Sequence, residues 1–354
     1  MTVHRLRRSL LAALALAAVL ALATACGSSS KASGAASGTA PRMKRVDVML
    51  DWTPNTNHSG MYLARAKGWY RAAGLDVHFI EPGANDDVLQ VVAGGRAQFG
   101  ISASEQLVPA RAQGVPVVSL AAIIQHNTSS LMALKSSGIN TLADLSGKTY
   151  GAFGEDFEKA LVGRMVACGG GKPGSVKFVD VGNVDYRVGL EKHFYDFVWV
   201  FDGWDVIRLR DIDKLPITTL PFIAHTDCIP DWYTPVLATS EHEIKTDPGL
   251  VRTFMAVTAR GYRAAMANPN EAAAALVKAV PELDPQLVHL SADYLAGHYA
   301  EDPAAWGQQD PAVWNRFVAF LESSKLVKPG FDTAAAYTNE FLPPASSTGS
   351  STGS

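Results

Sequence analysis

The densest group of polar and aromatic side chains in the sequence is Asp51-Trp-Thr-Pro-Asn-Thr-Asn-His58, which directly follows an apolar run. Trp52 offers a flat surface for stacking, and Asp51, Asn57 and His58 offer hydrogen-bond donors and acceptors. Together these groups are suited to hold a planar heterocycle. The alternative is that Pro54 and the asparagines form a turn and that Trp52 belongs to the core.

Short apolar runs alternate with helical patterns along the chain, which predicts an α/β fold with parallel sheets. The first set of strands is expected at 46–50, 75–80, 99–101 and 117–124, with helices over 60–69, 86–92 and 105–113. The second set has strands at 149–153 and 176–179, helices at 142–147 and 156–167, and an apolar run at 197–201 that is a central strand or a core helical turn. A strand at 236–239 and helices over 249–267, 270–280, 285–297 and 311–322 follow.

The order of these units predicts two lobes, because the chain builds one set, builds a second set and then returns. We place lobe 1 at 44–128 and 235–342, lobe 2 at 129–234, and the two crossings near 127–131 and 230–235. A cleft between lobes is a preferred place for a small-molecule pocket, and ligands bind at the carboxyl ends of strands. The 51–58 loop is therefore expected to face this cleft.

Three further residues, Asp231, Trp232 and Tyr233, fall at the predicted return crossing. Side chains at a crossing can reach both lobes, so we include all three among the ligand-binding candidates. The alternative is that they pack the hinge, which absorbs the closing motion of the lobes.

The first residues indicate export. Arg5, Arg7 and Arg8 precede an apolar run, Leu10 to Ala23, that is short for a membrane span. Small residues then lead to Cys26, which resembles the lipidated cysteine of bacterial lipoproteins; an ordinary cleaved signal is the alternative. We predict a signal peptide at 1–25, a tether at 26–43, a disordered tail at 343–354 and a lipid anchor on the outer face of the cell membrane.

Composition narrows the function further. The net charge is −3, with acids and bases scattered, so no basic face suggests nucleic acid. Of three cysteines, Cys168 and Cys228 remain once Cys26 is set aside, and their spacing leaves open whether they pair or stay free. Glu241-His-Glu243 falls at a helix start and is interpreted as a cap, so no metal site is expected.

At the 51–58 string the sequence resembles a family. That string, with Lys67-Gly-Trp-Tyr70, Ala73-Gly-Leu-Asp-Val77, Gly94-Gly-Arg-Ala-Gln-Phe-Gly-Ile101, Ala110-Arg-Ala-Gln-Gly-Val-Pro-Val117, Leu142-Ala-Asp-Leu-Ser-Gly-Lys148 and Pro230-Asp-Trp-Tyr-Thr-Pro-Val-Leu237, resembles the thiamine-pyrimidine superfamily. Its members include binding proteins of ABC importers and eukaryotic synthases of the thiamine pyrimidine. The resemblance runs from about 46 to 345 and implies a two-lobed periplasmic-binding-protein fold (type II) with the ligand between lobes.

The same resemblance argues against an enzyme. Where the synthases carry a lysine that holds pyridoxal phosphate and a histidine that is consumed, this chain has Ser102 and Gln106. Their phosphate cradle is replaced by Gly154-Glu-Asp-Phe157, and their cysteine-rich iron motif by Ile229-Pro-Asp-Trp-Tyr233. We therefore expect no cofactor and no catalytic residue, and a synthase activity is the least favoured interpretation.

The resemblance also suggests the second wall of the site. Asp202 aligns with an acid that family members place in the pocket, where a carboxylate would accept hydrogen bonds from an aminopyrimidine edge. Asp202 is equally suited to cap the helical stretch that follows, and Trp204 either lines the cleft or packs beneath it. Ser102 and Phe153 complete the candidates.

The predicted function is that of a solute-binding lipoprotein, a monomer that serves the permease and ATPase subunits of an ABC importer. By resemblance its ligand is a thiamine pyrimidine precursor of the hydroxymethylpyrimidine or formylaminopyrimidine type. Riboflavin or another flat vitamin is the alternative. Sulfonates and nitrate would need a cationic pocket, which the sequence does not offer.

Overall fold

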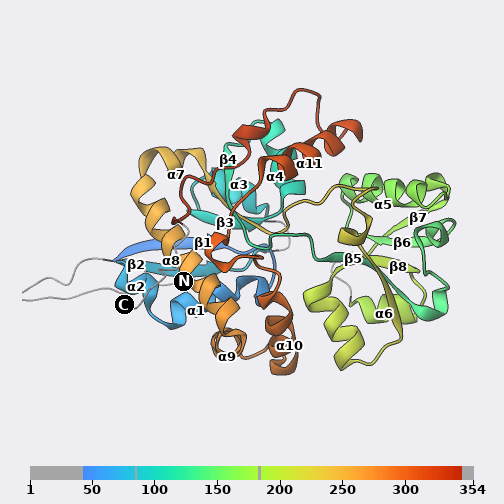
Figure 1. The fold of residues 1–354 in the computed structure, drawn as a ribbon, viewed down its shortest axis with the longest axis horizontal. Coiled ribbons are helices and arrows are strands. Elements are labelled where there is room, and N and C mark those ends of the chain that lie inside the picture. Colours follow the sequence, from blue (N-terminus) through green and yellow to red (C-terminus); the bar gives the residue numbers. More distant parts are fainter. Residues whose placement is uncertain (1–42, 84–85, 182–184, 345–354) are drawn as a thin grey trace, which may run out of the picture. The chain divides into compact units, whose positions relative to one another are not determined.

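The computed structural model describes residues 43–83, 86–181 and 185–344, and its strands form two five-stranded sheets (Figure 1). The first sheet has the order β2-β1-β3-β10-β4 and the second β7-β6-β8-β5-β9. The predicted signal peptide, Cys26, nearly all of the tether and most of the C-terminal tail lie outside these residues.

The first sheet is built from β1 (Lys44–Met49), β2 (Leu75–Ile80), β3 (Phe99–Ser102), β4 (Val117–Ala122) and β10 (Val236–Ser240). The second contains β5 (Ser129–Leu134), β6 (Thr149–Ala152), β7 (Lys177–Asp180), β8 (Phe197–Phe201) and β9 (Ile217–Pro221). The apolar run at 197–201 is thus a central strand, paired with β6 on one side and β5 on the other.

The strand directions show that the predicted α/β sheets are mixed rather than entirely parallel. In the first sheet β10 runs antiparallel to both β3 and β4, and in the second β5 runs antiparallel to both β8 and β9. Both exceptions are the strands that the chain enters directly after passing from the other sheet. Since such a strand starts at the edge where the other strands end, it must run in the opposite direction.

Helices cover both faces of each sheet. They are α1 (Ser59–Ala66), α2 (Trp69–Ala72), α3 (Val88–Ala93), α4 (Ser104–Ala112), α5 (Asp156–Cys168), α6 (Tyr186–Glu191), α7 (Glu241–Thr246), α8 (Pro248–Ala267), α9 (Pro269–Ala279), α10 (Pro285–Ala296) and α11 (Pro311–Ser323). One core joins the first sheet to α1 and α8, and another joins the second sheet to α6. Among the described residues, no helix is both long and apolar enough to cross a membrane.

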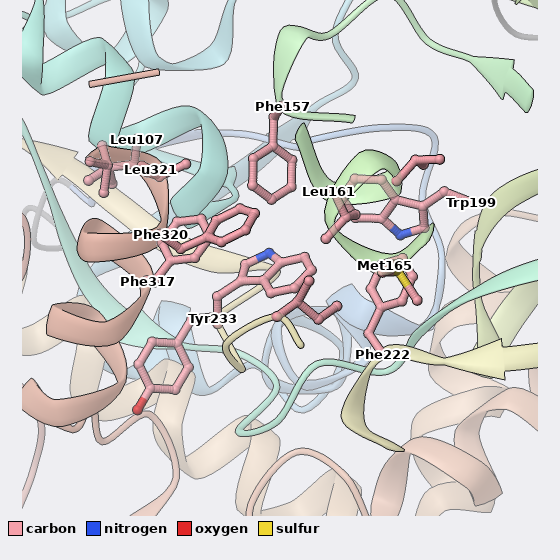
Figure 2. Packing of buried hydrophobic residues seen from close by; sticks show 14 of the residues in the cluster. Leu107, Phe157, Leu161, Met165, Trp199, Phe222, Tyr233, Phe317, Phe320 and Leu321 are labelled. Carbon is pink, nitrogen blue, oxygen red and sulfur yellow. The ribbon is translucent and has the colours of Figure 1, made fainter. Parts of the chain in front are cut away.

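A third core lies where elements from the two sheets meet, and Figure 2 shows its centre. We call it the aromatic cluster; it consists of Phe157, Trp199, Phe222, Trp232, Phe317 and Phe320. Phe157 and Trp199 belong to α5 and β8, whereas Phe317 and Phe320 belong to α11. The cluster therefore packs the C-terminal helix against the second sheet.

A disulfide adds a covalent link. Cys168, the last residue of α5, is bonded to Cys228 in the segment that returns to β10. This answers the question that the cysteine spacing left open. The bond closes a loop between residues 60 apart in sequence, which restricts the unfolded chain.

Candidate functional site

One cavity of 360 Å³, which we call the inner cavity, lies where the strand ends of both sheets meet. The loop after β1, the end of β3, and the segments after β6 and β8 all contribute to it. Thr128 and Thr234, which contribute as well, precede the antiparallel strands β5 and β10. Carboxyl ends of parallel strands and amino ends of antiparallel ones share one sheet edge, so the topology itself creates this meeting point.

The loop after β1 is held by its own polar side chains. Asn55 accepts a hydrogen bond from the Asn57 N–H at 2.9 Å and so begins the helical turn η1 (Thr56–His58). The Asn55 N–H donates to Nδ1 of His58 at 3.2 Å, which places the ring proton on Nε2. Nε2 then donates to Oδ1 of Asp51 at 2.8 Å. The buried imidazole thereby fixes the Asp51 carboxylate at the cavity.

Close packing of α8 against α1 supports the same loop. A Cβ on Gly261 of α8 would lie 2.1 Å from the carbonyl oxygen of Gly60 in α1, so only glycine lets the two helices approach this closely. Tyr262 then donates to the Asn57 carbonyl at 2.6 Å. From α10, Ser291 bridges the lobes, because it accepts from Thr56 and donates to the Gly203 carbonyl.

The second sheet supplies most of the aromatic surface. Phe153, Phe157, Tyr186, Trp199, Phe201 and Trp204 all line the inner cavity. Phe153 stands edge-on to Tyr186, with ring centroids 6.1 Å apart. Phe153 and Phe201 are 37% and 38% exposed, and Trp52 on the opposite side is 42% exposed. Large aromatic faces left open in one cavity are typical of a site that stacks a flat ligand.

Acidic groups occupy the same cavity, and burial raises the pKa values of Glu105, Glu155, Glu158 and Asp205. Burial raises the pKa of Glu105 to about 8, although the Trp232 Nε1–H, which donates to its Oε2 at 3.0 Å, acts in the opposite direction. Burial raises the pKa of Asp205 to about 7. The pKa of Glu158 is raised by burial too, while its oxygens accept from Tyr150 and from the Phe153 and Glu155 N–H groups.

A larger outer cavity of 710 Å³ adjoins the inner one, and the two share the lining residues Asp51, Ser102, Glu105, Gln106, Phe153, Glu155 and Phe157. Its remaining lining adds Asp86, Asp87 and Asp156. Among the described residues, no lysine, arginine or histidine lines either cavity. Despite its larger volume, the outer cavity has far fewer aromatic side chains, so the inner cavity is the better candidate for a planar ligand.

Six of the predicted site residues lie at the inner cavity: Asp51, Trp52, Asn57, Ser102, Phe153 and Trp204. The first four come from the first sheet and the last two from the second, so the structure brings together residues about 150 positions apart in the chain. Trp204, for which the sequence left a lining and an underlying position open, is among the lining residues.

Trp232 and Tyr233, at the return crossing, do not line the inner cavity. Trp232 is 1% exposed and stacks between Phe222 and Phe317, at centroid distances of 5.6 and 5.7 Å. Tyr233 is 3% exposed, and its hydroxyl accepts from the Asp310 N–H at 2.8 Å. Both rings are enclosed by α11 and lie outside the lining of the inner cavity, which agrees with the alternative that they pack the hinge.

Asp231 also serves the hinge and lies outside the inner cavity. Its carboxylate bonds to Nδ1 of His126 at 2.6 Å and accepts from the Asn127 N–H at 3.0 Å. It therefore ties the return segment to the segment that links β4 to β5. Asp231 lines a separate cavity of 600 Å³, together with His126 and the disulfide residue Cys228.

The remaining two predicted residues, His58 and Asp202, do not line the inner cavity. His58 is 0% exposed and acts through Asp51 rather than on a ligand. Asp202 does not line the inner cavity, nor does its side chain cap the helical turn η5 (Asp202–Val206); Asp205 instead accepts from the Phe201 N–H at 3.0 Å. Burial raises the pKa of Asp202 to about 6.

Sequence reasoning missed several lining residues, namely Asn55, Glu105, Tyr186, Phe201 and Asp205. Four of them sit at or just after the end of a strand, where the rule already used for the 51–58 loop would have found them. Glu105 lies in the first turn of α4, directly beyond β3. Tyr186 follows β7 and begins α6, a helix that was not predicted.

A known family model, described as NMT1/THI5 like, matches residues 55–272, which is more than half of the chain. The chain belongs to this family. The matched range includes η1, the end of β3, and the segments after β6 and β8. The match therefore spans most of the residues that line the inner cavity.

Three relatives show the range of this family. The chain is 26% identical to a 4-amino-5-hydroxymethyl-2-methylpyrimidine phosphate synthase of Legionella pneumophila, over 84% of this chain and 92% of the relative. It is 25% identical to a formylaminopyrimidine-binding protein of Halalkalibacterium halodurans, over 79% and 86%. It is 27% identical to the riboflavin-binding protein RibY of Chloroflexus aurantiacus, over 86% and 87%. The family thus includes both synthases and binding proteins.

Solved structures confirm the expected fold. The periplasmic aliphatic sulphonate-binding protein SsuA of Escherichia coli superimposes with a TM-score of 0.63 at 14% identity, over 82% of this chain and 91% of that one. At this identity the likeness concerns the fold alone. This chain has the α/β, two-lobed periplasmic-binding-protein fold, and both of its sheets are mixed.

Proposed function

We propose that this chain is the ligand-binding component of an ABC importer and that it captures a small planar heterocycle in the inner cavity. The observation that carries the proposal is the set of open aromatic faces, Trp52 from one side and Phe153 and Phe201 from the other, around one cavity. Its 360 Å³ falls within the range typical of small-ligand sites. Closure of the lobes on a stacked ring would mark the loaded state for a permease.

The ligand we favour is a thiamine pyrimidine precursor. The polar groups Asp51, Asn55 and Asn57 stand beside Trp52 and would bind the amine and ring nitrogens of an aminopyrimidine while the ring stacks. Riboflavin is the second candidate, because more aromatic side chains line the cavity than a single ring requires and one relative of similar identity is named for riboflavin binding.

The lining residues argue against the synthase activity found elsewhere in the family. Ser102 donates to Oε1 of Gln106 at 3.1 Å, and both line the cavity where the synthases resembled by this sequence carry a lysine and a histidine. No lysine among the described lining residues is available for a Schiff base with pyridoxal phosphate. The start of α5 carries Glu155, Asp156 and Glu158, which would repel a phosphate, so the cofactor does not fit this cavity.

Titration calorimetry tests the binding proposal. The purified protein is titrated with hydroxymethylpyrimidine, formylaminopyrimidine, thiamine and riboflavin, and saturable binding of at least one of them is expected. Binding of none would overturn the assignment of this cavity to a planar heterocycle.

A second experiment separates binder from enzyme. Protein mixed with pyridoxal phosphate should show no Schiff-base absorbance and, with iron added, should yield no pyrimidine product. Either signal at a level stoichiometric with the protein would restore the synthase interpretation.

Export and anchoring rest on residues 1–26 of the sequence. We propose that Cys26 carries a lipid and holds the protein at the outer face of the cell membrane. Cys26→Ala should release the protein into the soluble fraction. A variant that stays with the membranes as the unaltered protein does would contradict the anchor.

A further inference from the structure

The charged side chains that line the two adjoining cavities are all acidic. Five acids line the inner cavity, namely Asp51, Glu105, Glu155, Glu158 and Asp205, and the outer cavity adds Asp86, Asp87 and Asp156. No basic side chain among the described residues lines either of them. Two of these acids have partners that do not line the cavities: Lys159 pairs with Asp156 at 2.9 Å, and His58 bonds to Asp51 at 2.8 Å. For a protein with a net charge of only −3, this asymmetry is local to the cleft.

Not all of these carboxylates have a structural use. Glu158 is fully engaged by Tyr150 and two backbone N–H groups, and Asp87 caps α3. Asp51, in contrast, uses Oδ1 for His58, and within the described part of the chain its Oδ2 accepts no hydrogen bond, although the side chain is 29% exposed. Glu105 reaches the cavity from the first turn of α4. Acids without a local counter-charge are suited to a ligand that supplies one.

The aromatic side chains favour the same kind of ligand. The faces of aromatic rings carry partial negative charge, and a cation placed over them is attracted, most strongly by tryptophan. Trp52 and Trp204 line the inner cavity from opposite lobes, together with Phe153, Tyr186 and Phe201. A box of aromatic rings with carboxylates at its edge is the arrangement that recognises quaternary nitrogen in proteins.

We infer that the inner cavity selects planar aromatic ligands that carry a positive charge, such as a quaternised ring nitrogen, over their neutral counterparts. This inference rests on the proposed function, because it assumes that the inner cavity binds a planar heterocycle. It adds the charge class of the ligand, and it disfavours phosphorylated and sulfonated compounds. The raised pKa values of Glu105 and Asp205 agree with it, since a bound cation would supply the missing counter-charge.

Matched ligands test the inference directly. Thiamine, whose thiazolium ring is a permanent cation, is compared by calorimetry with 3-deazathiamine, in which carbon replaces the quaternary nitrogen and the charge is lost. A smaller pair is 1-methylnicotinamide and nicotinamide. We expect the cation of a pair to bind at least about tenfold more tightly than its neutral partner, and thiamine monophosphate to bind more weakly than thiamine.

Variants identify the groups responsible. Asp51→Asn keeps an acceptor for His58 and removes charge with little change of shape. Glu105→Gln keeps an acceptor for the Trp232 N–H and prevents the ionisation of this carboxyl that a bound cation would favour. Each should reduce the ratio of cation to neutral affinity severalfold. Glu282→Gln, an exposed acid outside both cavities, is the matched control and should preserve the ratio.

The outcomes separate the two proposals. Equal or tighter binding of the neutral partners, or binding of riboflavin or hydroxymethylpyrimidine alone, would overturn the charge selectivity and leave the proposed function standing. Binding of no planar compound would overturn both. A cation preference that persists unchanged in Asp51→Asn and Glu105→Gln would show that the cavity acids do not cause it, and would overturn the inference as well.

Discussion

The two sheets have the same strand plan but bring different chemistry to the inner cavity. Each has three neighbouring parallel strands, then an antiparallel fourth and a parallel edge strand (Figure 1). The first sheet contributes mainly polar groups, such as Asp51, Asn55 and Glu105, with Trp52 as its one aromatic ring. The second contributes six aromatic side chains.

This difference assigns separate tasks to the lobes. A stacking surface works only when a ring is pressed against it, whereas the polar loop after β1 is already fixed by Asn55 and His58. The first lobe is therefore preorganised to recognise polar atoms, and the second adds contact area when the lobes are together. The comparison can be tested by removing one kind of group at a time.

The largest effect is expected at Trp232, which joins the lobes without touching the cavity. Trp232→Ala would leave a void between Phe222 and Phe317 and deprive Glu105 of a donor, so the free energy of unfolding should fall by about 3–5 kcal/mol. Chemical denaturation measures this loss. A decrease below about 1 kcal/mol would show that the aromatic cluster does not hold the lobes together.

A smaller effect is expected from the acid that Trp232 contacts. Burial raises the pKa of Glu105 from 4.5 to about 8, so the fold favours its protonated form. This contribution to stability is fully present below about pH 4.5 and is lost as the pH rises through 8. Without ligand, the free energy of unfolding should therefore fall between pH 5 and pH 8 by roughly 1–3 kcal/mol more than in Glu105→Gln. Parallel pH profiles for the two proteins would contradict the assignment.

Trp52 tests the cavity itself. Because its ring is 42% exposed, Trp52→Ala should leave stability nearly unchanged, yet removing one stacking face should weaken ligand binding by about 1–3 kcal/mol, roughly 5- to 150-fold. Calorimetry with the tightest ligand of the panel measures the change. Phe194→Ala, at a ring that is 60% exposed and lies outside the cavity, is the control. Equal affinities in the two variants would place the site elsewhere.

The sequence predicted the fold well where elements have a simple pattern. Most predicted strands and helices agree with the structure within a few residues, and the end-of-strand rule located the 51–58 loop. It missed β5 (Ser129–Leu134), which begins with two serines yet is buried along its whole length. Burial on both faces removes the alternation by which a strand is usually recognised. It also missed β9 and α6, which have no distinct apolar pattern.

The site was predicted only in part, and the reason for the missed residues is related. Local rules identify which residues follow strands but not which of them a later segment covers. Trp232 and Tyr233 fall at a crossing, as expected, but α11, about 80 residues further along the chain, encloses them. Asp202 begins the turn η5, but Asp205, three residues further on, accepts from the Phe201 N–H and lines the cavity.

The smallest expected effect concerns the contact between the two crossing segments, which both lobes share. The Asp231 carboxylate, helped by Glu301, raises the pKa of His126 above its ordinary value of 6.5, while partial burial opposes this. The stabilisation is fully present below about pH 6.5 and is lost as the pH rises through the raised pKa. Since the imidazole is 45% exposed, solvent limits the contribution to about 0.2–1 kcal/mol. His126→Gln should remove that pH-dependent part in chemical denaturation between pH 6 and pH 8, whereas His78→Gln, at an exposed histidine of β2, should leave it unchanged. A profile unaffected by His126→Gln would mean that the charged pair does not tie the crossings, and that the aromatic cluster and the disulfide hold them instead.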